Sequence, residues 1–237
     1  MEDITRIPYI TIVFENRLMQ REIPLFRGAI ISKVPERYVL FHNHLNSGFR
    51  FAYPLIQYKL INGKAALFCI GKGTDEIRHF FSNSDMHLSI GEKESIFKVE
   101  NTWAKQWILQ TWNDSFSYSL HRWVPFNKNN YNKYLNSEGL IEKVNLLESI
   151  LIGNILSMSN TLGHHFDSPV ECKIIKVNNP RPYYHKGILL QGFDILFNTN
   201  VYLPNYIGIG KGASMGFGVI KQSGTIKDKK NELYGNE

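Results

Sequence analysis

The strongest constraint on the fold of this chain is the order of its short apolar segments, which repeats once along the sequence. In the first half, β-branched and aromatic runs alternate with apolar residues at helical spacing. They predict strand, helix, strand, strand, helix and strand at residues 8–15, 24–34, 51–61, 64–71, 73–81 and 86–90. Asn62-Gly63 joins the two central strands and favours a type I′ hairpin turn. Thr74, followed by two acidic residues, is the expected N-cap of the second helix.

The second half of the chain shows the same order with one exception. Strands are predicted at residues 116–126, 170–177, 187–197 and 215–221. A long helix is predicted over 140–162, because apolar residues recur there at spacings of three and four, and Gly163 stands where a C-terminal cap belongs. Residues 202–212, which are rich in glycine, take the place of the second helix.

Two βαββαβ units in tandem are a pair of ferredoxin-like folds, which belong to the α+β class. We expect the first domain at residues 1–100 and the second at 101–225, with a polar tail at 226–237.

The charge of the chain favours a polyanionic partner, and nucleic acid is the first candidate. Lys and Arg number 27 and Asp and Glu number 21, which gives a formal charge of +6 and a pI of about 9.2. Cys69 and Cys172 lie far apart in apolar runs, as is typical of reduced, buried thiols. The apolar run near the N-terminus is too short for a signal peptide, and no run is long enough to span a bilayer. We therefore expect a soluble, cytoplasmic protein without membrane contact.

Residues 208–220, GIGKGASMGFGVI, hold five glycines within eleven residues. A dinucleotide fingerprint needs a βαβ unit around it, and the chain after Ala213 is too short to supply one. The phosphate-binding P-loop pattern is absent as well, so we expect no nucleotide cofactor. Two interpretations remain open. Converging backbone N–H groups and Lys211 can hold a phosphate, or the glycines form a turn that is packed for steric reasons.

The same segment carries a resemblance to a known family. Gly208, Gly210, Gly216 and Gly218 form a glycine–apolar–glycine pattern twice, five residues apart. The pattern resembles the C-terminal signature of the RAMP superfamily, in the branch of CRISPR-associated endoribonucleases that process repeat RNA. Residues 41–63, FHNHLNSGFRFAYPLIQYKLING, and 151–163, LIGNILSMSNTLG, are similar to the same family.

The resemblance implies two ferredoxin-like RAMP domains, CRISPR repeat RNA in the precursor transcript as substrate, and cleavage without a metal or cofactor. It also implies that the glycine-rich segment contacts the RNA. The residues concerned are Gly208, Gly210, Lys211, Gly212, Ser214, Gly216 and Gly218. A homodimer and association with other CRISPR effector subunits are left open.

His42 and His44 are the candidate catalytic residues. They lie two residues apart in a segment that we expect to be extended, and in such a segment their imidazoles face the same side. Such a pair suits RNA cleavage in which the 2′-hydroxyl attacks its own phosphate, since one group must accept a proton and another must donate one. The products are a 2′,3′-cyclic phosphate and a 5′-hydroxyl. Which histidine is the base stays open, and so does the simpler interpretation of either one as a surface loop residue.

The side chains near this pair suggest further roles. Tyr53 can orient or donate to the phosphate, or it packs beside Pro54. Arg50 and Lys59 can stabilise the negative charge of the pentavalent phosphorus, although Lys59 also fits a solvated strand face. Two weaker candidates for phosphate contact lie in the first helix, and they are Arg27 and Lys33.

Three other functions compete with the endoribonuclease. The pairs His42–His44 and His164–His165 lack the further ligands that a zinc site needs, so we expect no metal. A RAMP-fold RNA-binding subunit without catalysis is the main alternative. Replacement of the histidines discriminates the two classes, because a binder keeps its affinity for RNA whereas an enzyme loses cleavage and not binding. A nucleotide-dependent enzyme is the third class.

Overall fold

The computed structural model describes residues 5–42, 44–45, 48–49, 52–178, 180–185 and 188–223, without the side chains at 42, 44, 45, 48, 49, 83, 184, 185 and 188. The described residues form two compact units. The N-terminal unit comprises Arg6–Trp107 together with Ser214–Gly216, a short piece from near the end of the chain. The C-terminal unit comprises Thr5, Ile108–Ala213 and the described residues from Phe217 onward.

The N-terminal unit has a four-stranded sheet with the order β4-β5-β1-β8. Its main elements are β1 (Arg6–Arg17), α1 (Ile23–Ile31), β4 (Ile56–Ile61), β5 (Lys64–Ile70), α3 (Gly73–Asn83) and β8 (Val99–Ile108). Shorter elements between them are η1 (Gln20–Glu22), α2 (Val39–His42), β2 (His44–Leu45), β3 (Gly48–Phe49), β6 (His87–Ile90) and β7 (Lys93–Ile96). The second, third, first and fourth main strands lie side by side in that order, which is the ferredoxin-like arrangement.

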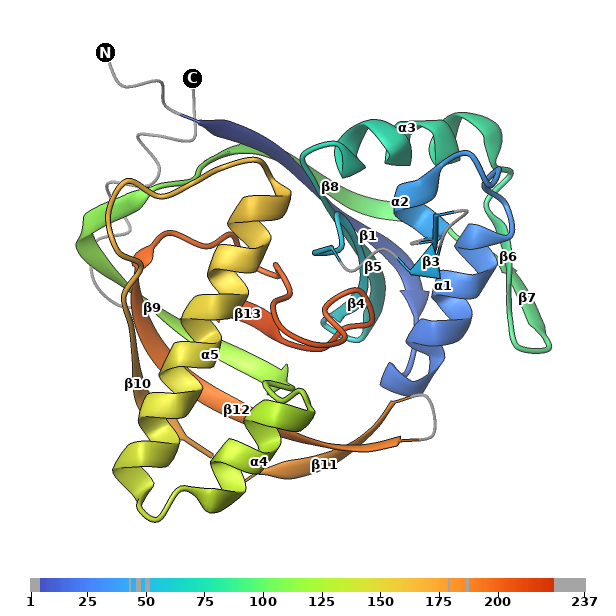
Figure 1. Ribbon diagram of the computed structural model, residues 1–237. Coiled ribbons are helices and arrows are strands. Elements are labelled where there is room, and N and C mark those ends of the chain that lie inside the picture. Colours follow the sequence, from blue (N-terminus) through green and yellow to red (C-terminus); the bar gives the residue numbers. More distant parts are fainter. Residues whose placement is uncertain are drawn as a thin grey trace. The chain divides into compact units, whose positions relative to one another are not determined.

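Helices α1 and α3 cover one face of this sheet (Figure 1). Apolar residues on the two helices and on alternate positions of β4 and β5 form one buried cluster. Phe26 on α1 stacks on Phe97 at 5.4 Å between ring centroids and meets Tyr58 of β4 edge-on at 5.9 Å. Asn62 and Gly63 have φ angles of 52° and 77°, so the predicted hairpin turn is confirmed.

Two local predictions for this unit are wrong. Helix α3 begins at Gly73 with Lys72 as N-cap, and the Thr74 hydroxyl instead donates to the Gly71 carbonyl at 2.8 Å. Residues 86–90 do contain a strand, β6, but it pairs with β7 in a separate hairpin. The fourth strand of the sheet is β8, whose first eight residues are exposed. An exposed strand has no alternation of apolar and polar residues, so the sequence pattern did not reveal it.

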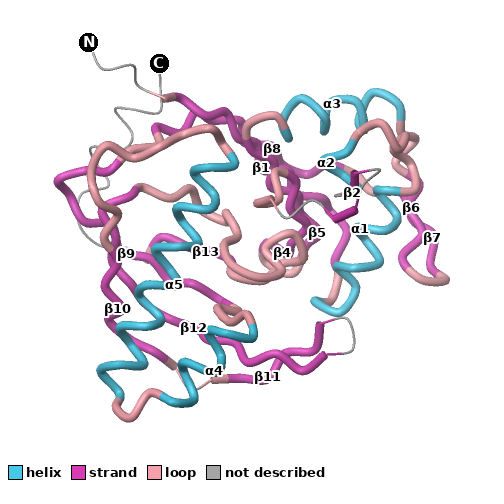
Figure 2. Tube along the Cα trace, in the orientation of Figure 1, coloured by secondary structure: helices cyan, strands magenta, loops and turns pink. Residues whose placement is uncertain are grey.

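The C-terminal unit repeats the arrangement with the strand order β10-β12-β9-β13. Its elements are β9 (Thr111–Trp123), α4 (Lys128–Asn136), α5 (Leu140–Thr161), β10 (Cys172–Val177), β11 (Arg181–His185), β12 (Ile188–Val201) and β13 (Val219–Gln222). Strand β11 adds to β12, and neither β11 nor α4 was predicted. Residues 202–218 form a loop where a second helix would stand (Figure 2). The predicted pair of ferredoxin-like folds is therefore confirmed.

Helix α5 runs across the face of its sheet (Figure 1). Leu147, Leu151, Ile155 and Met158 are buried at spacings of four, four and three, as the sequence pattern predicts. Gly163 has a φ of 75°, which confirms the predicted C-terminal cap. Among the described helices, none is long and apolar enough to cross a membrane.

Candidate active site

The tip of the glycine-rich segment is attached to the edge of the N-terminal sheet. The Tyr58 amide of β4 donates to the Ser214 carbonyl at 3.0 Å, and Tyr58 and Met215 form an isolated parallel bridge. The Gln20 side chain donates to the Met215 carbonyl at 3.4 Å. Because β4 is an edge strand, its outer backbone groups are available for such pairing. The N-terminal unit thus contains both the segment that carries His42 and His44, which we call the histidine segment, and Ser214–Gly216 of the glycine-rich segment.

The candidate histidines lie on a short stretch of backbone just before β4. His42 is the last residue of α2, and His44 begins β2, where it pairs with Phe49 of β3. The extended conformation predicted for both is therefore wrong for His42, and the argument from strand alternation does not apply to this pair. Their side chains lie outside the described part of the chain, and so does Arg50.

Two groups hold α2 in place, and the sequence analysis did not identify this role for either. The Arg27 guanidinium donates to the carbonyl of Phe41, next to His42, at 3.3 Å. The Glu76 carboxylate of α3 accepts from the Leu40 amide at 3.2 Å. Arg27 therefore fixes the backbone beside the first candidate histidine, and its predicted phosphate contact stays a prediction.

A buried chain of hydrogen bonds, which we call the Tyr53–Gln57–Lys59 network, follows the histidine segment. The Gln57 amide donates to the Tyr53 hydroxyl at 2.7 Å and to the Pro54 carbonyl at 3.1 Å. The Lys59 ammonium donates to Gln57 Oε1 at 2.7 Å. Tyr53 is 8% exposed, and Gln57 and Lys59 have no exposed surface. Gln57, which the sequence analysis missed, is therefore the centre of the network and ties the start of β4 to Lys59.

Burial shifts the titration of both ends of this network. It lowers the pKa of Lys59 to about 7, although the nearby Cys69 thiol acts in the opposite direction. The Lys59 ammonium also lies over the Phe68 ring at 5.5 Å from its centroid. Burial raises the pKa of Tyr53, so its hydroxyl stays protonated at neutral pH. The phosphate contact expected of Lys59 stays a prediction.

The other basic candidate in this unit, Lys33, is at the surface. Its ammonium pairs with the Asp85 carboxylate at 3.1 Å, and the two side chains are 37% and 62% exposed. A pair this exposed is screened by solvent and can exchange one anionic partner for another.

The glycine-rich segment of the C-terminal unit is shaped by close approaches. A Cβ on Gly218, whose φ is +59°, would lie 1.8 Å from the Ile209 carbonyl oxygen. The Ile209 amide donates to the Gly218 carbonyl at 2.9 Å, and the Gly218 amide donates to the Arg122 carbonyl at 3.1 Å. A Cβ on Gly210, with φ of +80°, would lie 2.8 Å from Trp123 Nε1. The steric interpretation therefore holds at these two glycines.

The same segment still offers surface to a ligand. Gly208, Gly216 and Gly218 are buried, whereas Lys211 is exposed and the remaining three predicted contacts are half-buried. These three are Gly210, Gly212 and Ser214. The buried glycines fix the path of the loop, and Lys211 presents a charge at its surface.

Known proteins match both units. A profile of the Cas6b N-terminal domain matches residues 5–107, and a profile of the Cas6b C-terminal domain matches residues 110–223. A crystal structure of Cas6b covers 92% of this chain and 100% of its own, with 29% identity and a TM-score of 0.84. The crystal structure of a CRISPR RNA processing endoribonuclease, also Cas6b, covers the same shares with 26% identity and a TM-score of 0.71.

Two further proteins are similar to this chain. Csf5, a type IV Cas6 crRNA endonuclease, has a similar fold at 12% identity and a TM-score of 0.54, over 93% of this chain and 100% of its own. An uncharacterized protein of Methanocaldococcus jannaschii is 38% identical over 100 residues, which is 41% of this chain. The match spans 65% of the length of that relative.

Proposed function

The chain belongs to the Cas6b family, and we propose that it is an endoribonuclease that binds and cuts the repeat RNA of CRISPR precursor transcripts. The observation that carries this proposal is the succession of both family domains over residues 5–223, interrupted only at 108–109. A similar solved protein is itself described as a CRISPR RNA processing endoribonuclease. The basic charge of the chain suits a polyanionic substrate.

The reaction is an internal transesterification without a metal. One of His42 and His44 accepts the proton of the 2′-hydroxyl, which attacks the adjacent phosphorus. The other donates a proton to the departing 5′-oxygen, so that the products are a 2′,3′-cyclic phosphate and a 5′-hydroxyl. Histidine suits both roles because its ordinary pKa lies near neutrality.

The Tyr53–Gln57–Lys59 network acts as support for this chemistry. Tyr53 and Pro54 are both hydrogen-bonded to Gln57, which fixes the chain where it leaves the histidine segment. Tyr53 therefore orients the segment rather than transferring a proton. Because the pKa of Lys59 is about 7, this side chain can be charged or uncharged at the working pH, and a phosphate bound nearby can favour its charged form.

Basic side chains on both units contact the RNA backbone. Lys33, Arg50 and Lys211 supply charge, while Arg27 combines phosphate contact with its bond to the Phe41 carbonyl. Such contacts give affinity that falls with salt, and they carry little sequence information.

Replacement of each histidine separates cleavage from binding. We expect His42→Ala and His44→Ala each to slow cleavage of labelled repeat RNA by a factor of roughly 10² to 10⁴. Affinity for the same RNA with a 2′-deoxy at the cut should stay within about twofold, because the histidines add little binding energy. His165→Ala, an exposed histidine of the C-terminal unit, is the matched control.

Two outcomes would contradict the proposal. If the wild-type protein binds the repeat RNA without cutting it, the chain is a RAMP-fold RNA-binding subunit. If both histidine variants cut at the wild-type rate, the catalytic groups lie elsewhere.

A further inference from the structure

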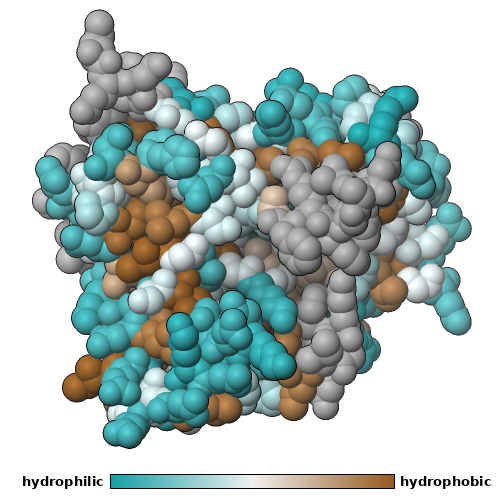
Figure 3. Space-filling view, in the orientation of Figure 1, coloured by the Kyte–Doolittle hydropathy of each residue, from teal (hydrophilic) through white to brown (hydrophobic). Residues whose placement is uncertain are grey.

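A cavity of about 610 Å³ lies within the C-terminal unit, between α4, α5 and the glycine-rich segment. Its floor is apolar, because Phe126 and Ile150 are buried there. Its rim is polar and includes Asn130, Lys133 and Lys211. Among the described residues that line it, none is acidic. Hydrophilic side chains gather over α4 on this face of the unit (Figure 3). The cavity therefore combines an apolar floor with a positively charged rim.

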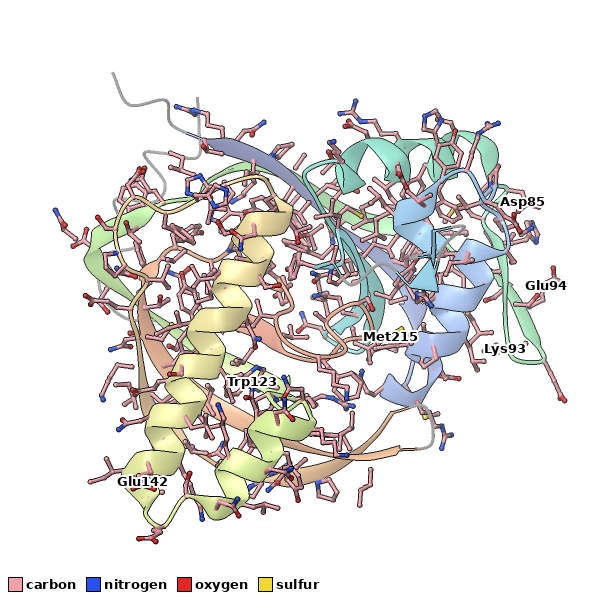
Figure 4. All side chains as sticks on the ribbon, in the orientation of Figure 1. Asp85, Lys93, Glu94, Trp123, Glu142 and Met215 are labelled. Carbon is pink, nitrogen blue, oxygen red and sulfur yellow. The ribbon has the colours of Figure 1, made fainter. Side chains whose placement is uncertain are left out.

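The two lysines of the rim come from different elements, and the position of one is fixed by the fold. The Lys211 amide donates to the Val124 carbonyl at 3.3 Å. The preceding Gly210 packs closely on Trp123, whose indole donates to Asn154 Oδ1 of α5 at 2.9 Å (Figure 4). The backbone at Lys211 is thus held beside α5 before any ligand binds, which lowers the entropy that is lost on binding.

Gly153 keeps the cavity open. It lies in the interior of α5, where glycine is among the least favourable residues. A Cβ built at this position meets no atom within 4 Å, so no close packing requires glycine here. Gly153 lines the cavity, and a longer side chain at this position would occupy it.

We propose that this cavity binds one unpaired nucleotide of the RNA substrate, an inference that rests on the proposed function. The base lies on the floor formed by Phe126 and Ile150, and the phosphate lies between Lys133 and Lys211. An unpaired base presents the flat apolar faces and polar edges that such a floor and rim accommodate. A free anion would leave the apolar floor without a partner, and an apolar peptide would leave the two charges without one.

Filling the cavity tests the proposal without removing a charge. Gly153→Leu places a side chain in the cavity, while Gly153→Ala is the matched control. Both replacements favour the helix, so a loss of binding does not report unfolding. The probe is the repeat RNA with a 2′-deoxy at the cut. We expect its affinity to fall about tenfold for Gly153→Leu, as for loss of one base contact. For Gly153→Ala, the loss of affinity should be smaller than for Gly153→Leu, since a methyl group fills much less of the cavity.

Removing one charge gives an independent test. Lys133→Gln should weaken binding about fivefold, as for a surface ion pair. The slope of log K against log salt should become shallower by about 0.7, as for one phosphate contact on a single strand. Lys176→Gln, at an exposed position of β10 outside the cavity, changes the net charge equally and should leave both quantities unchanged.

Wild-type affinity for both Gly153→Leu and Lys133→Gln would overturn this inference, while cleavage by the wild-type protein would leave the proposed function intact. Conversely, weaker binding by both variants of a protein that binds but never cuts would support the cavity and refute the enzyme. A wild-type protein that binds no repeat RNA would overturn both.

Discussion

Replacement of Lys59 by methionine is expected to make the protein more stable at neutral pH. Lys59 has no exposed surface, and its pKa of about 7 lies below the ordinary lysine value of 10.5. Between these two values the unfolded chain binds a proton at Lys59 that the folded protein does not. The free energy of unfolding of the wild-type protein therefore rises with pH across this window, and the full penalty is present below pH 7. Methionine keeps the apolar stem and removes the ammonium group.

The structure sets the magnitude of this effect. The two pKa values differ by 10.5 − 7 = 3.5, which corresponds to about 5 kcal/mol as an upper limit. The variant loses a donor to buried Gln57 Oε1, which costs about 1–3 kcal/mol. The net gain at pH 6.5 is then about 2–4 kcal/mol. Between pH 6.5 and pH 9.5 the difference in free energy of unfolding between variant and wild type should fall by about 3 kcal/mol. The reason is that the cost of burying a protonated Lys59 in the wild-type protein shrinks as the pH rises.

Urea unfolding at pH 6.5 and pH 9.5 measures this difference directly. Lys93→Met, at an exposed position of β7, is the matched control and should follow the wild-type profile. Parallel pH profiles for Lys59→Met and the wild type would refute the reasoning, since they would mean that Lys59 keeps its proton in the folded protein from pH 6.5 to pH 9.5.

Three further changes test other parts of the structure. Gly218→Ala should lower the free energy of unfolding, measured with urea, by about 2–4 kcal/mol, through left-handed strain and a backbone clash. Gly28→Ala, where the new Cβ meets no atom within 4 Å, should raise it. Equal effects of the two replacements would contradict the steric account. Asn154→Leu leaves the Trp123 indole N–H without its acceptor and should cost about 1–3 kcal/mol by the same measurement, and unchanged stability would show that this bond does not hold the loop. Tyr53→Phe should lower the cleavage rate less than about tenfold if Tyr53 only orients the segment, and a loss of 10²-fold or more would instead make it a proton donor.

Most of the fold could be predicted from local patterns in the sequence. The apolar stripe of α5 and the Asn62-Gly63 turn are local signals, and the structure confirms both. Strand β8 has no such signal, because its first eight residues face solvent. Its place in the sheet comes from pairing with β1, which is a contact between residues far apart in the sequence.

The candidate site was predictable only in part. The glycine pattern identified the loop, but the reason for glycine at Gly218 is the approach of the Ile209 carbonyl, nine residues away. Gln57 and Lys59 alternate on β4 as solvated residues often do, so the sequence pattern gave no sign that both are buried. Burial of a polar strand face depends on tertiary packing, and single-sequence patterns do not record it.

The most direct test of the account is cleavage of labelled repeat RNA in EDTA, beside a matched RNA that carries a 2′-deoxy at the cut site. The account predicts that the first RNA is cut to a 2′,3′-cyclic phosphate and a 5′-hydroxyl, while the second is bound and stays intact. Cleavage of both RNAs, or cleavage that stops in EDTA, would contradict attack by the 2′-hydroxyl without a metal.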